Sequence, residues 1–221
     1  MQNDNISITT LINLVDAYND NKVVNITNVI NLSGELNKKE SFLKSVLVSG
    51  DKESAFYQYA LSSMLCKAGK GKGKLIILNP VNGEEFLEEC APDVLICSPE
   101  DCLKELENID KYGDEFIIVM VINCIDILFY APDRFVNAIL RLQPMKNVVL
   151  WVATGNELGL LFPDNIIHTF ETRILFKTES QEFSKKMINT SEGLYLDDGS
   201  FIMYCRNSDT RQYVHPELGD E

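Results

Sequence analysis

A short stretch around Gly50 has the residue order of a phosphate-binding turn. Residues 46–48 form the apolar end of an expected strand, Gly50 closes it, and a helical pattern begins at Ser54. A strand, a tight glycine turn and a helix in this order present backbone N–H groups at a helix N-terminus, where phosphate binds. The sequence therefore predicts the frame of a phosphate-binding loop.

The residues that would complete this loop are missing. A working loop reads G-x-x-x-x-G-K-[ST], in which the lysine contacts the outer phosphates and the hydroxyl binds Mg²⁺. Only three residues, Asp51, Lys52 and Glu53, separate Gly50 from Ser54. The loop is too short, it lacks the second glycine, and Glu53 stands at the lysine position, where its carboxylate repels phosphate. We expect a degenerate nucleotide loop that does not support catalysis.

The rest of the chain supplies the elements that would position this turn. We expect strands at residues 46–49, 75–78, 94–97, 116–122, 148–153, 173–176, 193–196 and 201–205. Helical patterns separate most of them, at residues 54–66, 83–89, 99–109, 133–142 and 180–188. Strands separated by helices of this length form a parallel sheet that is covered on both faces. The expected fold class is α/β, a mostly parallel central sheet flanked by helices, with the last two strands as a C-terminal hairpin.

Local signals predict one helix start and one domain boundary. Ser98 is followed by a proline and two acidic residues, which is typical of a capped helix N-terminus. Residues 1–40 combine one amphipathic helical pattern with a weak strand pattern and a polar loop. We expect an N-terminal segment of a helix and edge strands at residues 1–40 and the main domain at residues 41–221.

The composition restricts the class of protein and of ligand. Apolar residues make up 45% of the chain and charged residues 24%, as in an ordinary soluble globular domain. The apolar run at residues 116–122 is too short to cross a bilayer, and we find no signal peptide, so we expect a cytoplasmic location without direct membrane insertion. The net charge of −13 disfavours DNA as a partner, because phosphate contacts need lysine and arginine.

The cysteines and histidines do not form a metal-binding pattern. None of the six cysteines forms a C-x-x-C pair, and the two histidines are far apart in the chain. Most of the cysteines lie in apolar runs, where a reduced thiol behaves as a small hydrophobic side chain. We expect no metal site.

The second half of the chain carries an ordered set of motifs. An apolar strand at residues 116–122 runs into Ile-Asp-Ile-Leu, residues 133–142 end in Ile-Leu-Arg-Leu, residues 147–154 read Asn-Val-Val-Leu-Trp-Val-Ala-Thr, and residues 172–176 read Thr-Arg-Ile-Leu-Phe. In this order they resemble the motifs of FtsK/SpoIIIE ATPases, and the resemblance extends over residues 46–205. It implies a RecA-like P-loop NTPase fold.

The departures from this family pattern fall on ATP hydrolysis. The family's Walker B strand ends in Asp-Glu, which hold Mg²⁺ through its water and polarise the attacking water. Here the corresponding pair is Asn123-Cys124, or Ile122-Asn123 after a shift of one residue, and Asp126 follows. Neither pair contains an acid, so we expect a degenerate Walker B site.

A second departure falls on the sensor of the terminal phosphate. The family has Gln-Arg-Pro after Ala-Thr, whereas this chain continues from Thr154 with Gly155 and then Asn-Glu. The Thr-Arg-Ile motif keeps its arginine as Arg173. The resemblance implies that Thr154, Gly155 and Arg173 are remnants of a sensor without a catalytic role.

Tandem modules with eroded ATP sites occur in EssC/EccC coupling proteins of type VII secretion, and this chain resembles one such module. The resemblance implies no catalytic residue and no cofactor beyond weak ATP binding. It also implies protein partners, either small helical secretion substrates or sister ATPase modules, and a membrane tether through a larger parent protein. Phe129 and Tyr130, close to the carboxyl edge of the expected sheet, are candidates for a peptide-binding pocket.

Two alternatives stay open at this point. The first is a residual ATPase whose site is completed by acidic residues of a neighbouring subunit. The second is an accessory protein of a DNA-translocation or conjugation motor, although the negative net charge weighs against it.

Overall fold

The structure is a computed structural model, and it describes residues 44–51, 73–81, 92–155, 162–197, 200–206 and 209–214. The N-terminal segment at residues 1–40 and the helices expected at residues 54–66 and 83–89 lie outside the described residues, so these predictions and the domain boundary at residue 40 stay predictions.

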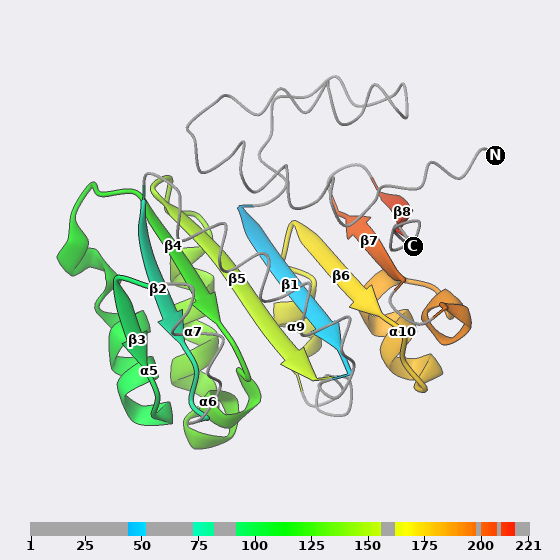
Figure 1. Ribbon diagram of the computed structural model, residues 1–221, viewed down its shortest axis with the longest axis horizontal. Coiled ribbons are helices and arrows are strands. Elements are labelled where there is room, and N and C mark those ends of the chain that lie inside the picture. Colours follow the sequence, from blue (N-terminus) through cyan, green and yellow to red (C-terminus); the bar gives the residue numbers. More distant parts are fainter. Residues whose placement is uncertain are drawn as a thin grey trace, which may run out of the picture.

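The described strands form a single sheet of eight strands in the order β3-β2-β4-β5-β1-β6-β7-β8 (Figure 1). Their bounds are β1 Ser45–Gly50, β2 Lys74–Leu78, β3 Val94–Ile96, β4 Ile117–Val121, β5 Val148–Gly155, β6 Thr172–Phe176, β7 Phe201–Cys205 and β8 Thr210–Val214. The strands from β3 to β6 in this order pair in parallel, and β7 and β8 pair antiparallel. The predicted mostly parallel α/β sheet is confirmed.

The described helices all lie on one face of this sheet and share a core with it (Figure 1). Their bounds are α5 Pro99–Glu107, α6 Ile125–Tyr130, α7 Pro132–Leu142, α9 Asp164–Ile167 and α10 Gln181–Ile188, with 3-10 turns η1 Ile109–Tyr112 and η2 Glu192–Tyr195. Alternate residues of β4, namely Ile117, Val119 and Val121, join this core, and the intervening Ile118 and Met120 are also buried. A strand that is buried on both faces is apolar throughout, which explains the continuous run at residues 116–122.

The helix start predicted at Ser98 is confirmed. The Ser98 side chain accepts a hydrogen bond from the backbone N–H of Asp101, Pro99 is the first helical residue, and Glu100 and Asp101 lie in the first turn. These features satisfy a free N–H group and place acids at the positive end of the helix.

The strand predicted at residues 193–196 is wrong, because this segment forms the turn η2. Gly193 fits tightly between β6 and α10: an added Cβ would lie 2.7 Å from the Leu175 side chain and 2.8 Å from Ser184 Oγ. Its backbone N–H donates to Ser184 Oγ at 3.0 Å, and its carbonyl accepts from Thr178 N–H. These contacts hold the segment in a turn, and it does not pair as a strand. The C-terminal hairpin consists of β7 and β8 instead.

Candidate functional site

The carboxyl ends of the central parallel strands meet at one edge of the sheet. In the register, Gly50 at the end of β1 lies opposite Gly155 at the end of β5, and Ser49 lies opposite Thr154. The end of β4 lies between β2 and β5 at the same edge. Ligands of open parallel sheets bind at this edge. The tertiary structure therefore brings Gly50, Thr154 and Gly155 together with the residues that follow β4.

The β1 end of this edge is described only as far as Asp51. Gly50 is the buried last residue of the strand, and Asp51 is exposed to solvent. The predicted loop residues Lys52, Glu53 and Ser54 lie outside the described residues, so the degenerate nucleotide loop stays a prediction.

The chain turns sharply at the position where FtsK/SpoIIIE ATPases, which the sequence resembles, carry their Walker B acids. Ile122 continues the pairing of β4 by donating its N–H to the carbonyl of Leu78 at 2.8 Å. Asn123 then adopts a left-handed backbone with φ of 51°, a conformation that asparagine tolerates better than most residues. Cys124 is buried and precedes α6, and its N–H donates to the carbonyl of Ala153 at 3.2 Å. The side chains of Asn123 and Cys124 are an amide and a thiol, and neither is a carboxylate.

The amide of Asn123 is bound to a second buried amide. Its Nδ2 donates to Oδ1 of Asn79 at 2.9 Å, and Asn79 is only 1% exposed. Asn79 directly follows β2, and its own N–H donates to the carbonyl of Ile96. The Asn79 Oδ1 that accepts this bond also lies 3.4 Å from the N–H of Val81. Two neutral side chains thus occupy the ends of β2 and β4.

Sequence reasoning missed Asn79. The only signal for it was an asparagine directly after the apolar run at residues 75–78, which by itself indicates no more than a strand end. The pairing with Asn123 depends on the parallel alignment of β2 with β4, and this alignment brings together residues that are 44 positions apart.

The nearest acidic residue after β4 is Asp126, in the first turn of α6. Its side chain is partly exposed, and its backbone N–H donates to the carbonyl of Asn123 at 3.2 Å, which closes the turn. Within the described ranges, no three or more histidine, cysteine or acidic side chains form a group that could hold a metal ion. Asp126 therefore stands at this edge without the other ligands that a metal site among these residues would need.

The structure does not bring Arg173 to this edge. Arg173 pairs with Leu47, three residues before Gly50, and it is buried. One guanidinium nitrogen lies 3.0 Å from His168 Nδ1 and donates to the carbonyl of Lys186 at 3.3 Å, and the guanidinium lies 4.3 Å from the centre of the Tyr204 ring. Burial lowers the pKa of Arg173. Its contacts bind the C-terminal end of α10 to β6 and β7, which is a structural role.

The pocket candidates Phe129 and Tyr130 lie on the surface of α6. They are 64% and 51% exposed, whereas Ile127 and Leu128 of the same helix are buried in the core. Both aromatic side chains face solvent, and a pocket that they line stays a prediction.

None of the helices in the described ranges combines the length and the apolar character needed to cross a membrane.

Sequence comparison finds no relative: no protein-family model matches the chain, and no curated protein matches it. Structure comparison finds several. The genome packaging NTPase B204 of Sulfolobus turreted icosahedral virus 2, in complex with AMPPCP, is 15% identical with a TM-score of 0.58, and the match covers 80% of this chain and 100% of that one. The chain has the P-loop NTPase fold.

Two further neighbours are longer chains, and this chain matches a part of each. The cytoplasmic domain of the type VII secretion ATPase EccC from Thermomonospora curvata is 12% identical with a TM-score of 0.61 over 81% of this chain, and this chain spans 26% of it. The pCW3 conjugation coupling protein TcpA, solved with ATPγS, is 13% identical with a TM-score of 0.62, and the match covers 82% of this chain and 62% of that one. At identities this low, the structural matches establish the fold alone. The P-loop NTPase fold implied by the resemblance is confirmed.

Proposed function

We propose that this chain is a non-hydrolysing ATPase-like module of a type VII-like secretion system, which binds a secretion substrate or a neighbouring ATPase module. The observation that carries this proposal is the buried, neutral pair of Asn79 and Asn123 at the carboxyl edge of the sheet. In this proposal the module works without a cofactor beyond weak ATP binding, and a larger parent protein tethers it to the membrane.

Hydrolysis of ATP on this fold requires a carboxylate near the end of β4. The acid orients Mg²⁺ and polarises the attacking water, and an amide cannot accept a proton from that water. Asn123 donates its Nδ2 to Asn79, and the next side chain, Cys124, is fully buried. Asn123 and Cys124 therefore offer no carboxylate as a general base, which supports the proposed loss of hydrolysis.

Two observations support a protein as the partner. One structure of Thermomonospora curvata EccC holds a signal sequence peptide, and that structure is 13% identical to this chain with a TM-score of 0.55. The net charge of this chain is −13, which opposes contact with nucleic acid phosphates. The neighbours B204 and TcpA favour an accessory role in DNA translocation or conjugation as the second candidate.

A nucleotide titration tests the loss of hydrolysis. We expect calorimetry with Mg·ATP to show no binding of ordinary micromolar affinity. We also expect the rate of phosphate release to equal that of a control sample without the protein. The control variants are Ser54→Ala, which removes the serine hydroxyl of the predicted loop, and Asp126→Asn, which removes the acid in the first turn of α6.

Turnover that these two variants abolish would contradict the proposal. If that turnover appeared only at protein concentrations where the chain forms oligomers, it would support the residual ATPase completed by a neighbouring subunit.

A further inference from the structure

Two adjacent aromatic side chains stand out on the surface of the described part of the chain. Phe129 and Tyr130 end α6 and are 64% and 51% exposed. We call this pair the α6 patch. Leaving aromatic surface in water forgoes the free energy that its burial would give, and exposed aromatic pairs are typical anchors of protein interfaces.

The surroundings of the α6 patch are acidic. The helices α5, α6 and α7 pack against one another and together carry six acidic and three basic side chains. Lys104 and, to a smaller extent, Tyr130 lower the pKa of the Glu100 carboxyl in the first turn of α5.

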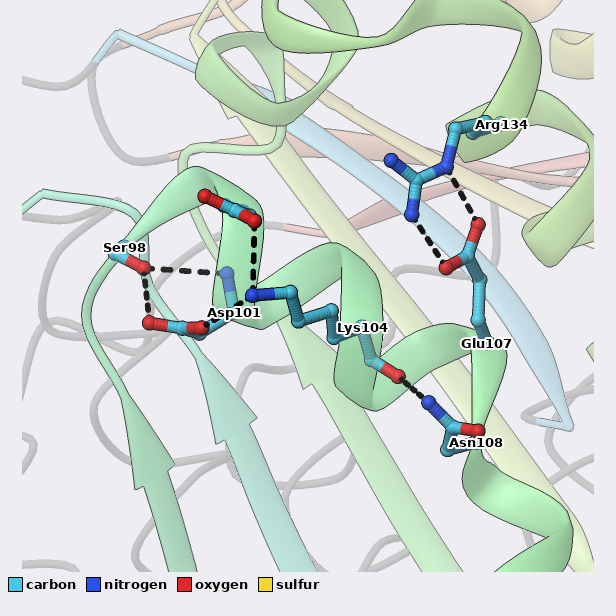
Figure 2. A network of polar contacts seen from close by, with 7 residues as sticks. Ser98, Asp101, Lys104, Glu107, Asn108 and Arg134 are labelled. Atoms are coloured by element: carbon cyan, nitrogen blue, oxygen red, sulfur yellow. Dashed lines mark hydrogen bonds and ion pairs between the residues drawn. The ribbon is translucent and has the colours of Figure 1, made fainter.

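All three basic side chains of these helices already have acidic partners. Lys104 lies 2.8 Å from Glu100 and 3.4 Å from Asp101. Arg134 binds both carboxylate oxygens of Glu107, at 2.8 and 2.6 Å, and so joins α7 to α5 (Figure 2).

The third cation, Arg141, pairs with Asp110 and also donates to the carbonyls of Leu106 and Glu107. Asp126 and Asp133, which lie on either side of the α6 patch in the sequence, have no basic partner among the described residues. The aromatic pair therefore sits in a negative local potential.

The aromatic side chains of the α6 patch and the acidic residues around it favour a partner with both basic and apolar side chains. An apolar side chain of the partner would cover the Phe129 ring, and lysine or arginine would contact the aromatic faces and the carboxylates of Asp126 and Asp133. A second copy of the chain is a poor fit, because it would bring acidic helices and a net charge of −13 together.

We propose that the α6 patch is the docking surface for a protein segment that carries apolar side chains next to lysine or arginine. This proposal deepens the proposed function by giving the partner-binding surface, and it rests on the partner-binding part of that function and not on the loss of hydrolysis.

Fluorescence anisotropy with the full chain tests the docking surface. The probe is a labelled amphipathic helical peptide of leucine and lysine, and its twin carries glutamate in place of lysine. We expect the lysine peptide to bind at low salt and the glutamate peptide not to bind. The double variant Phe129→Ala/Tyr130→Ala should weaken binding about tenfold or more, because aromatic anchors dominate such interfaces.

Two variants separate the patch from general charge attraction. Asp126→Asn/Asp133→Asn should weaken binding roughly threefold and reduce its salt dependence, because two charges near the aromatic pair are lost. Tyr195→Ala removes a tyrosine that is 80% exposed on η2 and should leave the affinity unchanged. Thermal unfolding checks that each variant is folded.

Equal affinity of the unaltered chain and Phe129→Ala/Tyr130→Ala would overturn the proposal, as would equal binding of both peptides. Sedimentation that showed a dimer lost in the same double variant would assign the patch to a second copy and would also overturn it. If the peptide does not bind and the chain does not hydrolyse ATP, the docking surface fails but the proposed loss of hydrolysis stands. If the peptide binds and the chain hydrolyses ATP, only the proposed loss of hydrolysis is contradicted.

Discussion

The contacts of Arg173 lie among β6, β7 and the end of α10 and not at the carboxyl edge of the sheet. Its guanidinium contacts a histidine ring nitrogen, a backbone carbonyl and a tyrosine ring. Its Nε has no hydrogen-bond partner among the described residues. Burying a cation that is not paired with a carboxylate costs desolvation free energy. Arg173 therefore stabilises the fold through packing and through its hydrogen bond to the carbonyl of Lys186 near the end of α10.

We expect Arg173→Ala to lower the free energy of unfolding by roughly 2–4 kcal/mol, because it leaves a cavity and an unsatisfied carbonyl. Arg173→Met keeps most of the side-chain volume without a buried charge and should cost less. Urea unfolding of both variants measures the difference. A loss for Arg173→Met as large as that for Arg173→Ala would show that the charge, and not the packing, carries the stability.

Cys102 gives a prediction on pH dependence. Burial, the largest cause, raises the pKa of this thiol to about 12, and Sγ donates to the carbonyl of Ile96 at 3.4 Å. Because the folded pKa lies above the value of about 8.5 in an unfolded chain, the contribution of the thiol is complete below that pH and is lost as the pH rises toward the folded pKa.

We therefore expect the unaltered chain to lose stability between pH 8 and pH 11 more steeply than Cys102→Ala, since the variant lacks this titration. Urea midpoints across this range measure the two slopes. Parallel curves would contradict the assignment, because every other titrating group is shared by the two chains.

At the scale of the element, capping side chains fix where two helices begin. Ser98 Oγ accepts from the N–H of Asp101 at 3.2 Å at the start of α5, and Ser180 Oγ accepts from the N–H of Phe183 at 3.1 Å at the start of α10. Each bond satisfies one N–H group that the helix itself leaves free. The first cap also holds the helix that flanks the α6 patch.

We expect Ser98→Ala and Ser180→Ala each to lower the free energy of unfolding by about 1 kcal/mol. Ser98→Thr and Ser180→Thr retain the oxygen acceptor and serve as matched controls with smaller losses. Chemical denaturation of the four variants measures the effect. Alanine variants as stable as their threonine counterparts would mean that the caps do not stabilise these helices.

At the scale of the whole molecule, the charge balance bears on the two candidate partner classes, DNA and protein. The P-loop NTPase fold is shared with a genome packaging NTPase, a conjugation coupling protein and a secretion ATPase, so the fold alone does not choose between DNA and protein. The net charge of −13 disfavours DNA, because counterion release from DNA needs basic side chains.

We expect no retardation of a short DNA duplex by this chain in a gel-shift assay at low salt, where phosphate contacts are strongest. A basic DNA-binding protein in the same gel confirms that the assay detects binding. Retardation that disappears as salt is raised would favour the accessory role in a DNA motor over the secretion module.

Much of the fold follows from local patterns. The buried strand β4 and residues 148–153 of β5 are continuous apolar runs, and the start of α5 follows from a serine, a proline and two acids. The strand prediction at residues 193–196 failed because a tight fit of Gly193 against Leu175 and Ser184 outweighed its apolar sequence. That fit involves residues distant in sequence, and no local pattern reports it.

The sequence by itself determined the α/β class, the first turn of α5 and the absence of an acid at residues 122–124, since each depends on neighbouring residues. Only the tertiary structure decided that Asn79 binds Asn123, that Arg173 lies away from Gly50, and that Phe129 and Tyr130 face solvent beside acidic helices. The physical reason is that strand alignment and helix packing join positions far apart in the chain, and these long-range contacts fix which side chains meet.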